Sequence, residues 1–242
     1  MVIDAQPDAG WTVILPLKGG AAAKSRLGRG PDLARAIALD CLDAVLACPA
    51  VGRVLVVTAD GRTAADAAEA GAEVVPEHRP GSGLVAAVRD GLAAAARPDA
   101  ARLDVDRPDI GRPDADRPVA VLLGDLPALR PHDLAVALGV AGRTLADHPD
   151  APMAALPDAE GSGTVLLAGR RPADLDPAFG PASLAEHRLR GAVVVALPPD
   201  PPSDPVSARL RHDVDTPADL GVALALGAGP RTAALASRRS AS

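Results

Sequence analysis

The chain contains 242 residues with a formal net charge of −6 at pH 7, and its only aromatic residues are one Trp and one Phe. An acidic chain with so few aromatic rings is a poor candidate for nucleic-acid binding, because phosphate backbones attract basic surfaces and unpaired bases stack on aromatic rings. The sequence has no run of about 18 uncharged apolar residues and no basic-then-apolar leader pattern, so we expect a soluble, cytoplasmic protein without a membrane partner.

The first predicted strand, Trp11–Leu15, leads into a loop rich in glycine and positive charge, and a helix is predicted to begin near Pro31. Gly19 and Gly20 allow a tight turn that points backbone N–H groups at an anion. Three cations lie in the same loop: Lys18, Lys24 and Arg26. Such a loop between a strand and a helix suits a polyphosphate, although it matches neither the Walker P-loop nor the dinucleotide-binding glycine pattern. The alternative is an ordinary surface turn with solvated basic residues.

Helical and β-branched segments alternate after this loop. The expected elements are the helix from 31, a strand at 51–58, a helix at 63–70, a strand at 73–75 and a helix at 83–96. Strands that alternate with helices predict an α/β fold with a mainly parallel sheet and helices on both faces.

Residues 97–118 interrupt this alternation, because Arg-Pro-Asp recurs there and so much proline and charge cannot bury a core. We expect one domain over residues 1–228, with a low-complexity surface insertion at 97–118 and a polar tail at 229–242. The elements expected after the insertion are strands at 119–123, 153–156, 163–168 and 193–197, and helices at 131–145, 183–190 and 216–226.

Acidic residues follow a predicted strand and precede the last predicted helix in the second half of the chain. Asp125 lies in a sharp turn after the strand at 119–123, and Asp213 and Asp215 lie before Thr216. Ligands of parallel sheets bind beyond the strand ends, where carboxylates from separate segments can share Mg²⁺. Together with the basic loop, this pattern suggests a nucleoside triphosphate with magnesium. We expect Asp213 and Asp215 to point to opposite sides, so that at most one faces the metal; alternatively, Asp125 is only a turn or cap residue.

Two glycine-containing loops offer backbone amides and hydroxyls. Gly161–Thr164 precedes a predicted strand, and Phe179–Ser183 ends at a helix start, with His187 one turn further on. Such groups could hold a small phosphorylated acid. The alternative is a pair of ordinary loops.

Taken in this order, these segments resemble the guanylyltransferases of coenzyme F-420 biosynthesis, the family of 2-phospho-L-lactate guanylyltransferase and phosphoenolpyruvate guanylyltransferase. The segments that carry the resemblance are Lys18 with Ala23–Leu27, Gly124–Leu129, Gly161–Thr164, Phe179–Ser183 with His187 and Arg188, and Asp213–Leu220.

The resemblance implies a three-layer nucleotidyltransferase fold, GTP as donor, and Mg²⁺ held by Asp125 and Asp213. It also implies that phosphoenolpyruvate or 2-phospho-L-lactate is bound by three positions: Thr164, Gly180 and Ser183. We expect catalysis to depend on the charges of Lys18, Lys24 and Arg26. We assign the nucleotide contacts to Gly19, Gly83 and Leu84. A homodimer and a downstream transferase are both left open as protein partners.

The chain also departs from the family at two positions, since Val85 follows Leu84 and Val165 follows Thr164 where many members carry Asn. Two alternatives therefore stay open. One is another nucleotidyltransferase of this architecture, of the molybdopterin or sugar-phosphate type, and the other is a non-catalytic nucleotide-binding module.

Overall fold

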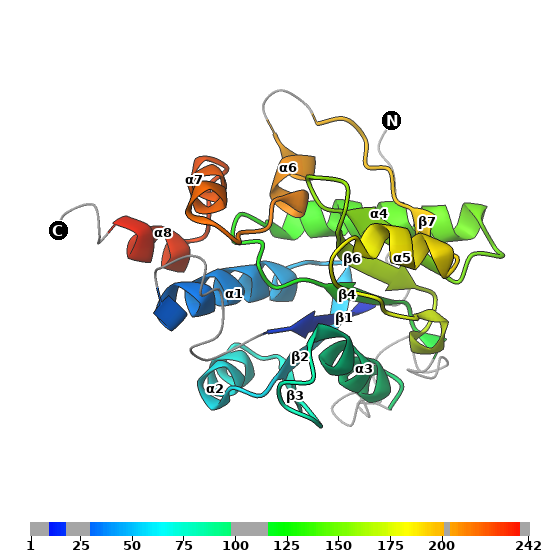
Figure 1. Cartoon of the computed structure of the whole chain (residues 1–242), viewed down its shortest axis with the longest axis horizontal. Coiled ribbons are helices and arrows are strands. Elements are labelled where there is room, and N and C mark those ends of the chain that lie inside the picture. The colour runs from blue at the N-terminus through cyan, green and yellow to red at the C-terminus, as the bar shows by residue number, and fades with distance from the viewer. Residues whose placement is uncertain (1–9, 18–29, 98–115, 201–203, 238–242) are drawn as a thin grey trace.

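The structure is a computed structural model that describes residues 10–17, 30–97, 116–200 and 204–237. Within these ranges, one seven-stranded sheet lies between layers of helices (Figure 1). The strands are β1 (Trp11–Pro16), β2 (Val51–Thr58), β3 (Glu73–Pro76), β4 (Val119–Leu122), β5 (Met153–Pro157), β6 (Thr164–Gly169) and β7 (Val193–Val194). The helices are α1 (Gly30–Leu46), α2 (Gly61–Glu69), α3 (Leu84–Ala95), α4 (Pro131–Asp147), the 3-10 turn η4 (Pro172–Asp174), α5 (Ser183–Leu189), α6 (Val206–Arg211), α7 (Pro217–Ala225) and α8 (Pro230–Ser237).

The sheet has the strand order β3-β2-β1-β4-β6-β5-β7. Neighbouring strands run parallel except β6, which is antiparallel to both β4 and β5. The mainly parallel sheet expected from the sequence is therefore confirmed. The chain passes from β1 to β2 and β3 on one side and then returns to β4 on the other side of β1. The order thus reverses between β1 and β4, and in open α/β sheets ligands bind outside the carboxyl ends of the strands at such a switch point.

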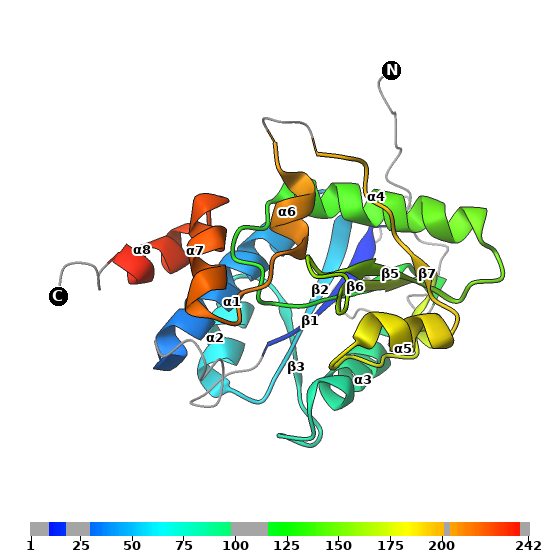
Figure 2. The ribbon, with the colours of Figure 1, turned by 45° about the horizontal axis from the view of Figure 1, so that its top comes forward.

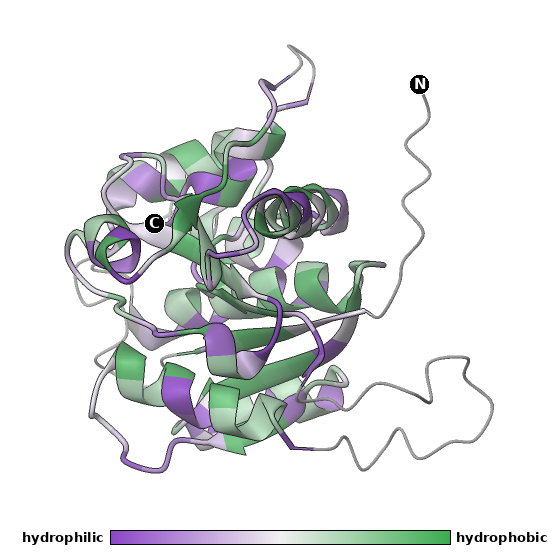
Figure 3. Cartoon of the chain, turned by 90° about the vertical axis from the view of Figure 1, so that its right-hand side faces the viewer, coloured by the Kyte–Doolittle hydropathy of each residue, from purple (hydrophilic) through white to green (hydrophobic). Residues whose placement is uncertain are grey.

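Alternate residues of each strand face opposite helix layers, as the two-residue period of a strand requires. In β1, Val13 and Leu15 pack in a cluster with residues of α1 and α4, whereas Ile14 packs in a second cluster with residues of α3. Figure 2 shows α4 on one side of the sheet and α3 and α5 on the other. Figure 3 shows the strands in the middle of the molecule coloured mainly as hydrophobic. Val, Leu and Ala dominate both clusters, which compensates for the scarcity of aromatic residues.

Three expectations about the C-terminal part need correction. Residues 206–211 form α6 and residues 230–237 form α8, although no helix was predicted in either place and the second lies within the expected tail. α8 packs on α1, where the buried carboxylate of Asp40 accepts hydrogen bonds from the backbone N–H of Arg231 (3.2 Å) and Thr232 (2.8 Å). The strand expected at 193–197 pairs as β7 over two residues only.

The basic loop and most of the expected insertion, residues 18–29 and 98–115, lie outside the described residues. Among the residues that are described, no helix is both long and apolar enough to cross a bilayer.

Candidate active site

Three carboxylates meet beyond the carboxyl end of β4. Asp125, Asp213 and Asp215 each offer an oxygen, and these oxygens all lie within 4.8 Å of one another. We call these three residues the acidic cluster. Asp125 and Asp213 are half-buried and Asp215 is exposed, so the cluster opens to solvent on one side. The convergence of Asp125 and Asp213 agrees with the expectation from the sequence.

Asp125 is placed by the end of β4 and by one glycine. The backbone N–H of Leu123 donates to the carbonyl of Val165 (3.0 Å), which holds the end of β4 against the start of β6. At Gly124 a Cβ atom would collide with Cδ2 of Leu17, the residue that follows β1. Glycine therefore lets the turn before Asp125 lie directly against the end of β1, at the switch point of the sheet.

Asp213 and Asp215 are fixed by the residue between them. The backbone N–H of Val214 donates to the carbonyl of Asp125 (3.1 Å), which ties the two acidic segments together. The Val214 side chain is fully buried and packs with Leu33 of α1 and Leu220 of α7. The expectation that Asp213 and Asp215 point to opposite sides is wrong, because residues two apart in an extended segment share one side and only the residue between them faces the other way.

Two arginines hold the segment that leads to Asp213. Arg209, which is 1% exposed, makes a bidentate ion pair with the fully buried carboxylate of Asp133 in α4 (2.7 and 2.5 Å). Arg211 donates to the backbone carbonyls of Pro157 (2.9 Å) and Asp158 (3.0 and 2.5 Å). α6 is thus tied both to α4 and to the loop between β5 and β6.

Thr164 begins β6 at the end of the sheet where the acidic cluster lies, beyond the carboxyl end of β4. Because β6 is antiparallel to β4, its first residue lies beside the end of β4. In the preceding loop the carboxylate of Asp158 accepts hydrogen bonds from the backbone N–H of Ser162 (3.0 Å) and Gly163 (2.7 Å). The Thr164 side chain is 2% exposed, and its Oγ1 lies 2.9 Å from Nδ1 of His187 in α5.

The second expected acceptor loop is joined to Thr164 through His187 and α5. The backbone N–H of Ala178 donates to Nε2 of His187 (2.9 Å), and the N–H of Leu184 donates to the carbonyl of Ser162 (3.1 Å). Ser183 is buried, and its own N–H donates to the carbonyl of Gly180 (3.1 Å). Hydrogen bonds through His187 and α5 therefore link the three expected acceptor residues: Thr164, Gly180 and Ser183.

His187 is a residue whose contacts the sequence reasoning missed. It is fully buried, and its ring meets that of Phe179 edge to face with the centroids 5.0 Å apart. Burial, together with the positive charge of Arg190, lowers the pKa of His187 to about 4, and the carboxylate of Asp176 opposes this shift. The imidazole is therefore neutral at physiological pH.

The expected nucleotide-binding residues are only partly described. Gly83 and Leu84 stand at the start of α3, after β3, and Gly83 adopts a φ of 93° that favours glycine. Four expected site residues lie outside the described residues: Lys18, Gly19, Lys24 and Arg26. The described residues on either side of that segment do reach the site, because Leu17 lies against Gly124 and Leu33 packs with Val214.

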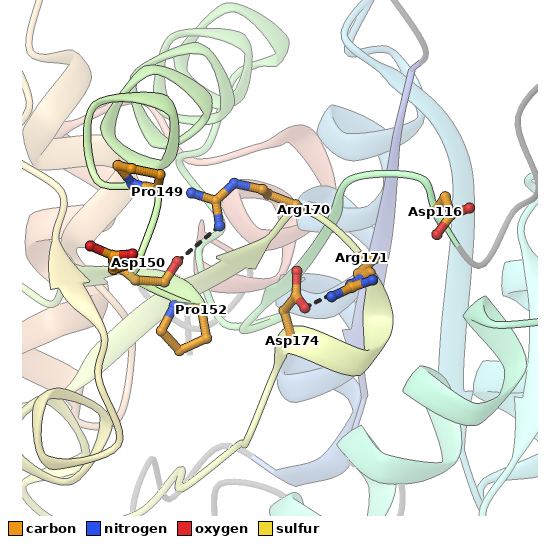
Figure 4. Close-up of a pocket in the computed structure, with 8 residues that line it drawn as sticks. Asp116, Pro149, Asp150, Pro152, Arg170, Arg171 and Asp174 are labelled. Atoms are coloured by element: carbon orange, nitrogen blue, oxygen red, sulfur yellow. Dashed lines mark hydrogen bonds and ion pairs between the residues drawn. The ribbon is translucent and has the colours of Figure 1, made fainter.

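A separate cavity of about 440 Å³ lies at the opposite edge of the sheet (Figure 4). Arg170 and Arg171 line it just after β6, at the end of that strand remote from Thr164. Arg170 donates to the carbonyl of Ala151 (2.9 Å), and Arg171 pairs with Asp174 (2.8 Å). None of the residues that line this cavity belongs to the acidic cluster.

The donor set of the acidic cluster fits a hard divalent cation. Mg²⁺ is bound in proteins by one or two carboxylates together with substrate phosphates and water. Three carboxylates this close together also repel one another, and a cation relieves that repulsion. The residues suited to hold it are Asp125 and Asp213, which are expected from the sequence, and Asp215, which the structure adds.

No protein-family model matches the chain. A phosphoenolpyruvate guanylyltransferase from Streptomyces coelicolor is 46% identical over 236 residues, which cover 94% of this chain and 96% of that protein. A protein of the same name from Salinispora arenicola is 46% identical over 233 residues, which cover 93% of this chain and 92% of that protein.

Solved structures share the fold at much lower identity. A nucleotidyl transferase from Methanothermobacter thermautotroptrophicus matches with a TM-score of 0.53 and 20% identity, covering 90% of this chain and 97% of that one. A structure of CMP:2-keto-3-deoxy-manno-octonic acid synthetase complexed with CTP matches with a TM-score of 0.51 and 17% identity, covering 90% of this chain and 98% of that one. These likenesses concern the fold alone, and they confirm the nucleotidyltransferase architecture expected from the sequence.

Proposed function

Because the chain belongs to the phosphoenolpyruvate guanylyltransferase family, we propose that it transfers GMP from GTP to phosphoenolpyruvate and releases pyrophosphate, as a step of coenzyme F-420 biosynthesis. The product is enolpyruvyl-diphospho-5'-guanosine. We favour phosphoenolpyruvate over 2-phospho-L-lactate as the acceptor because the relatives are named phosphoenolpyruvate guanylyltransferase. The observation that carries the proposal within the molecule is the acidic cluster at the switch point of the sheet.

The proposed reaction needs no general base. A phosphate oxygen of phosphoenolpyruvate, already anionic at neutral pH, attacks the α-phosphorus of GTP. The bond from that phosphorus to the oxygen bridging to the β-phosphate breaks, and pyrophosphate leaves with the bonding electrons. The obstacle is repulsion between two anions, so catalysis rests on positioning and charge neutralisation. The neutral, fully hydrogen-bonded state of His187 agrees with this, because the ring has no free nitrogen with which to take a proton.

We assign the metal site to Asp125 and Asp213, with Asp215 as a third available carboxylate. A bound Mg²⁺ would neutralise charge on the α-phosphate and make its phosphorus more electrophilic. The protein's own part is to hold these carboxylates together. It does so through the Val214–Asp125 backbone hydrogen bond and the burial of the Val214 side chain.

The remaining roles follow the expectations from the sequence. Thr164, Gly180 and Ser183 would bind the phosphate and carboxylate of the acceptor, and Gly19, Gly83 and Leu84 would contact the nucleotide. Three cations would offset the charge of the triphosphate: Lys18, Lys24 and Arg26. We also expect the protein to act in the cytoplasm, either as a homodimer or beside a downstream transferase that takes up its product.

The direct test replaces Asp125 by Asn, which keeps the size of the side chain and removes its charge. We expect Asp125→Asn to lower pyrophosphate release from GTP and phosphoenolpyruvate by about 100-fold or more, since charge neutralisation at the α-phosphate is lost. Asp147→Asn is the matched control, because Asp147 is exposed at the far end of α4, and it should keep full activity.

Product mass identifies the acceptor in the same assay. GTP and Mg²⁺ are incubated separately with phosphoenolpyruvate and with 2-phospho-L-lactate.

Normal turnover by Asp125→Asn would remove the acidic cluster from the mechanism. No turnover of the unchanged protein with either acid would overturn the proposed reaction.

A further inference from the structure

His187 contacts both parts of the proposed acceptor site, Thr164 and the loop that leads to Gly180 and Ser183. It is not itself one of the proposed acceptor-binding residues. Its Nδ1 lies 2.9 Å from Oγ1 of Thr164, at the start of β6. Its Nε2 accepts the backbone N–H of Ala178 (2.9 Å), in the loop that continues to Gly180 and Ser183. The imidazole is fully buried, so these contacts use both of its nitrogens without any access of solvent.

The contact to Ala178 fixes where the ring carries its proton. A backbone N–H can only donate, so Nε2 must present a lone pair. A neutral imidazole with an unprotonated Nε2 carries its hydrogen on Nδ1. The low pKa of His187, caused mainly by burial and then by the charge of Arg190, excludes the doubly protonated ring at neutral pH.

The direction of the hydrogen bond to Thr164 follows. Since Nδ1 carries the hydrogen, it donates to Thr164 Oγ1, which acts as the acceptor in this contact. The hydroxyl hydrogen of Thr164 is then directed away from His187, toward another acceptor. A hydroxyl fixed as a donor suits a phosphate or carboxylate oxygen, both of which only accept.

We propose that His187 is a positioning residue of the acceptor site: it orients the Thr164 hydroxyl as a donor to the phosphorylated acid and holds the loop of Gly180 and Ser183 at a fixed distance from it. The inference rests on the proposed function, because it takes Thr164, Gly180 and Ser183 as the residues that bind the acceptor. The edge-to-face contact of Phe179 fixes the plane of the ring, so the only Phe of the chain serves the same arrangement.

The test is a double-mutant cycle in steady-state kinetics. We expect His187→Ala to raise the KM for phosphoenolpyruvate by about tenfold or more, since small misplacements of a binding group are costly. The KM for GTP should stay within about twofold, because the acidic cluster is held by other contacts. Thr164→Val, which removes the hydroxyl and keeps the shape, should raise the same KM. His187→Ala should then add less in the Thr164→Val background than in the unchanged protein, since only its contact to the loop of Gly180 and Ser183 is left to lose.

His187→Asn supplies the conservative comparison. Its amide N–H can take the place of Nδ1–H, while its shorter side chain does not reach Ala178, so we expect partial rescue of the KM relative to His187→Ala. It also replaces His187→Ala in the cycle if that variant does not fold, as judged by circular dichroism. A role in packing alone would change the KM of both substrates and would multiply with the effect of Thr164→Val; either result would overturn the proposal.

A measurement without turnover separates this inference from the proposed function. Nitrogen-15 NMR of the unchanged protein should show His187 protonated at Nδ1 only, and protonation at Nε2 would overturn the orientation of Thr164. Failure of the unchanged protein to use either phosphorylated acid would overturn the proposed function and with it the assignment of the acceptor. Turnover with independent effects of His187 and Thr164 would overturn the role of His187 alone.

Discussion

His187 is a buried imidazole kept neutral in the folded protein, and this couples its protonation to folding. Its pKa is lowered from 6.5 to about 4, first by burial and then by Arg190, with Asp176 acting in the opposite direction. Between these two values the unfolded chain binds a proton and the folded chain does not. The free energy of unfolding must therefore fall as the pH falls through this window, and the loss is complete only below the folded pKa.

We predict that this one group removes about 3 kcal/mol of stability between pH 7 and pH 4, since each pKa unit corresponds to about 1.4 kcal/mol. The measurement is urea unfolding of the unchanged protein and of His187→Asn across this range. The variant loses hydrogen bonds and should be less stable at pH 7, but the difference in unfolding free energy should narrow toward pH 4. A constant difference would show that His187 titrates at its ordinary pKa.

Some site residues were predictable from the sequence because their signal is local. Asp125 follows an apolar run, so its place at a strand end could be expected, whereas Asp213 follows α6 and is brought to it by the hydrogen bond from Val214 to Asp125. The signal for Asp215 was equally local. It was missed because Asp213 and Asp215 were expected on opposite sides of an extended segment, whereas residues two apart lie on the same side. The role of His187 could not be read, because its partners are 9 and 23 residues away and belong to different elements.

The buried ion pair between α4 and α6 fixes the approach to the acidic cluster. Arg209 and Asp133 are 1% and 0% exposed, and a second carboxylate, Asp204, pairs with Arg209 from a side chain that is 40% exposed (2.7 Å). A charge buried this deeply is very costly once its partner is removed, whereas an exposed pair contributes little.

We predict that Arg209→Met lowers the unfolding free energy by about 3 to 5 kcal/mol, because it leaves the Asp133 carboxylate buried and unbalanced. Asp204→Asn is the matched control on the same arginine and should cost much less, because the Asp204 side chain is 40% exposed. Chemical denaturation monitored by far-ultraviolet circular dichroism measures both. Equal effects of the two variants would mean that burial does not govern the strength of this network.

Elements with a strong local signal were predicted well, and short elements held by distant side chains were not. The last predicted helix begins at a capping box in which Thr216 accepts from the N–H of Asp219 and Asp219 accepts from the N–H of Thr216 (2.7 Å), a pattern visible in the sequence. α6 and α8 carry no such signal over six and eight residues. Arg209 anchors α6 to α4, and Asp40 anchors α8 to α1. Tertiary contacts therefore determine that these two helices form.

For the whole molecule, a cation held by the acidic cluster should stabilise the folded state, because the cluster joins segments that separate on unfolding. At a Mg²⁺ concentration ten times its dissociation constant, the gain is about 1.4 kcal/mol. This corresponds to a rise in Tm of about 3 to 6 °C for a chain of this size. Differential scanning fluorimetry measures it, and excess EDTA should reverse it.

Asp213→Asn should abolish most of this rise, whereas Asp147→Asn should retain it. A rise that is the same in all three proteins would place the bound ion elsewhere.

The architecture of the molecule was predictable as an α/β sheet because strands and helices alternate along the first half. The strand order and the direction of β6 were not predictable, because a buried strand has the same apolar sequence pattern whether it runs parallel or antiparallel to its neighbours. The direction of β6 follows from its pairing with β4 and β5, a long-range property that no local pattern records.

The reversed direction of β6 has an evolutionary consequence. Thr164 reaches the shared edge at the beginning of a hairpin strand, whereas Asp125 reaches it at the end of a parallel one. The hairpin connection at 158–163 can therefore gain or lose residues without shifting the pairing of β1, β2 and β4. On the proposed assignment of the acceptor to Thr164, remodelling of that connection would change the acceptor side of the site first, provided that its contacts to Arg211 and Leu184 are kept.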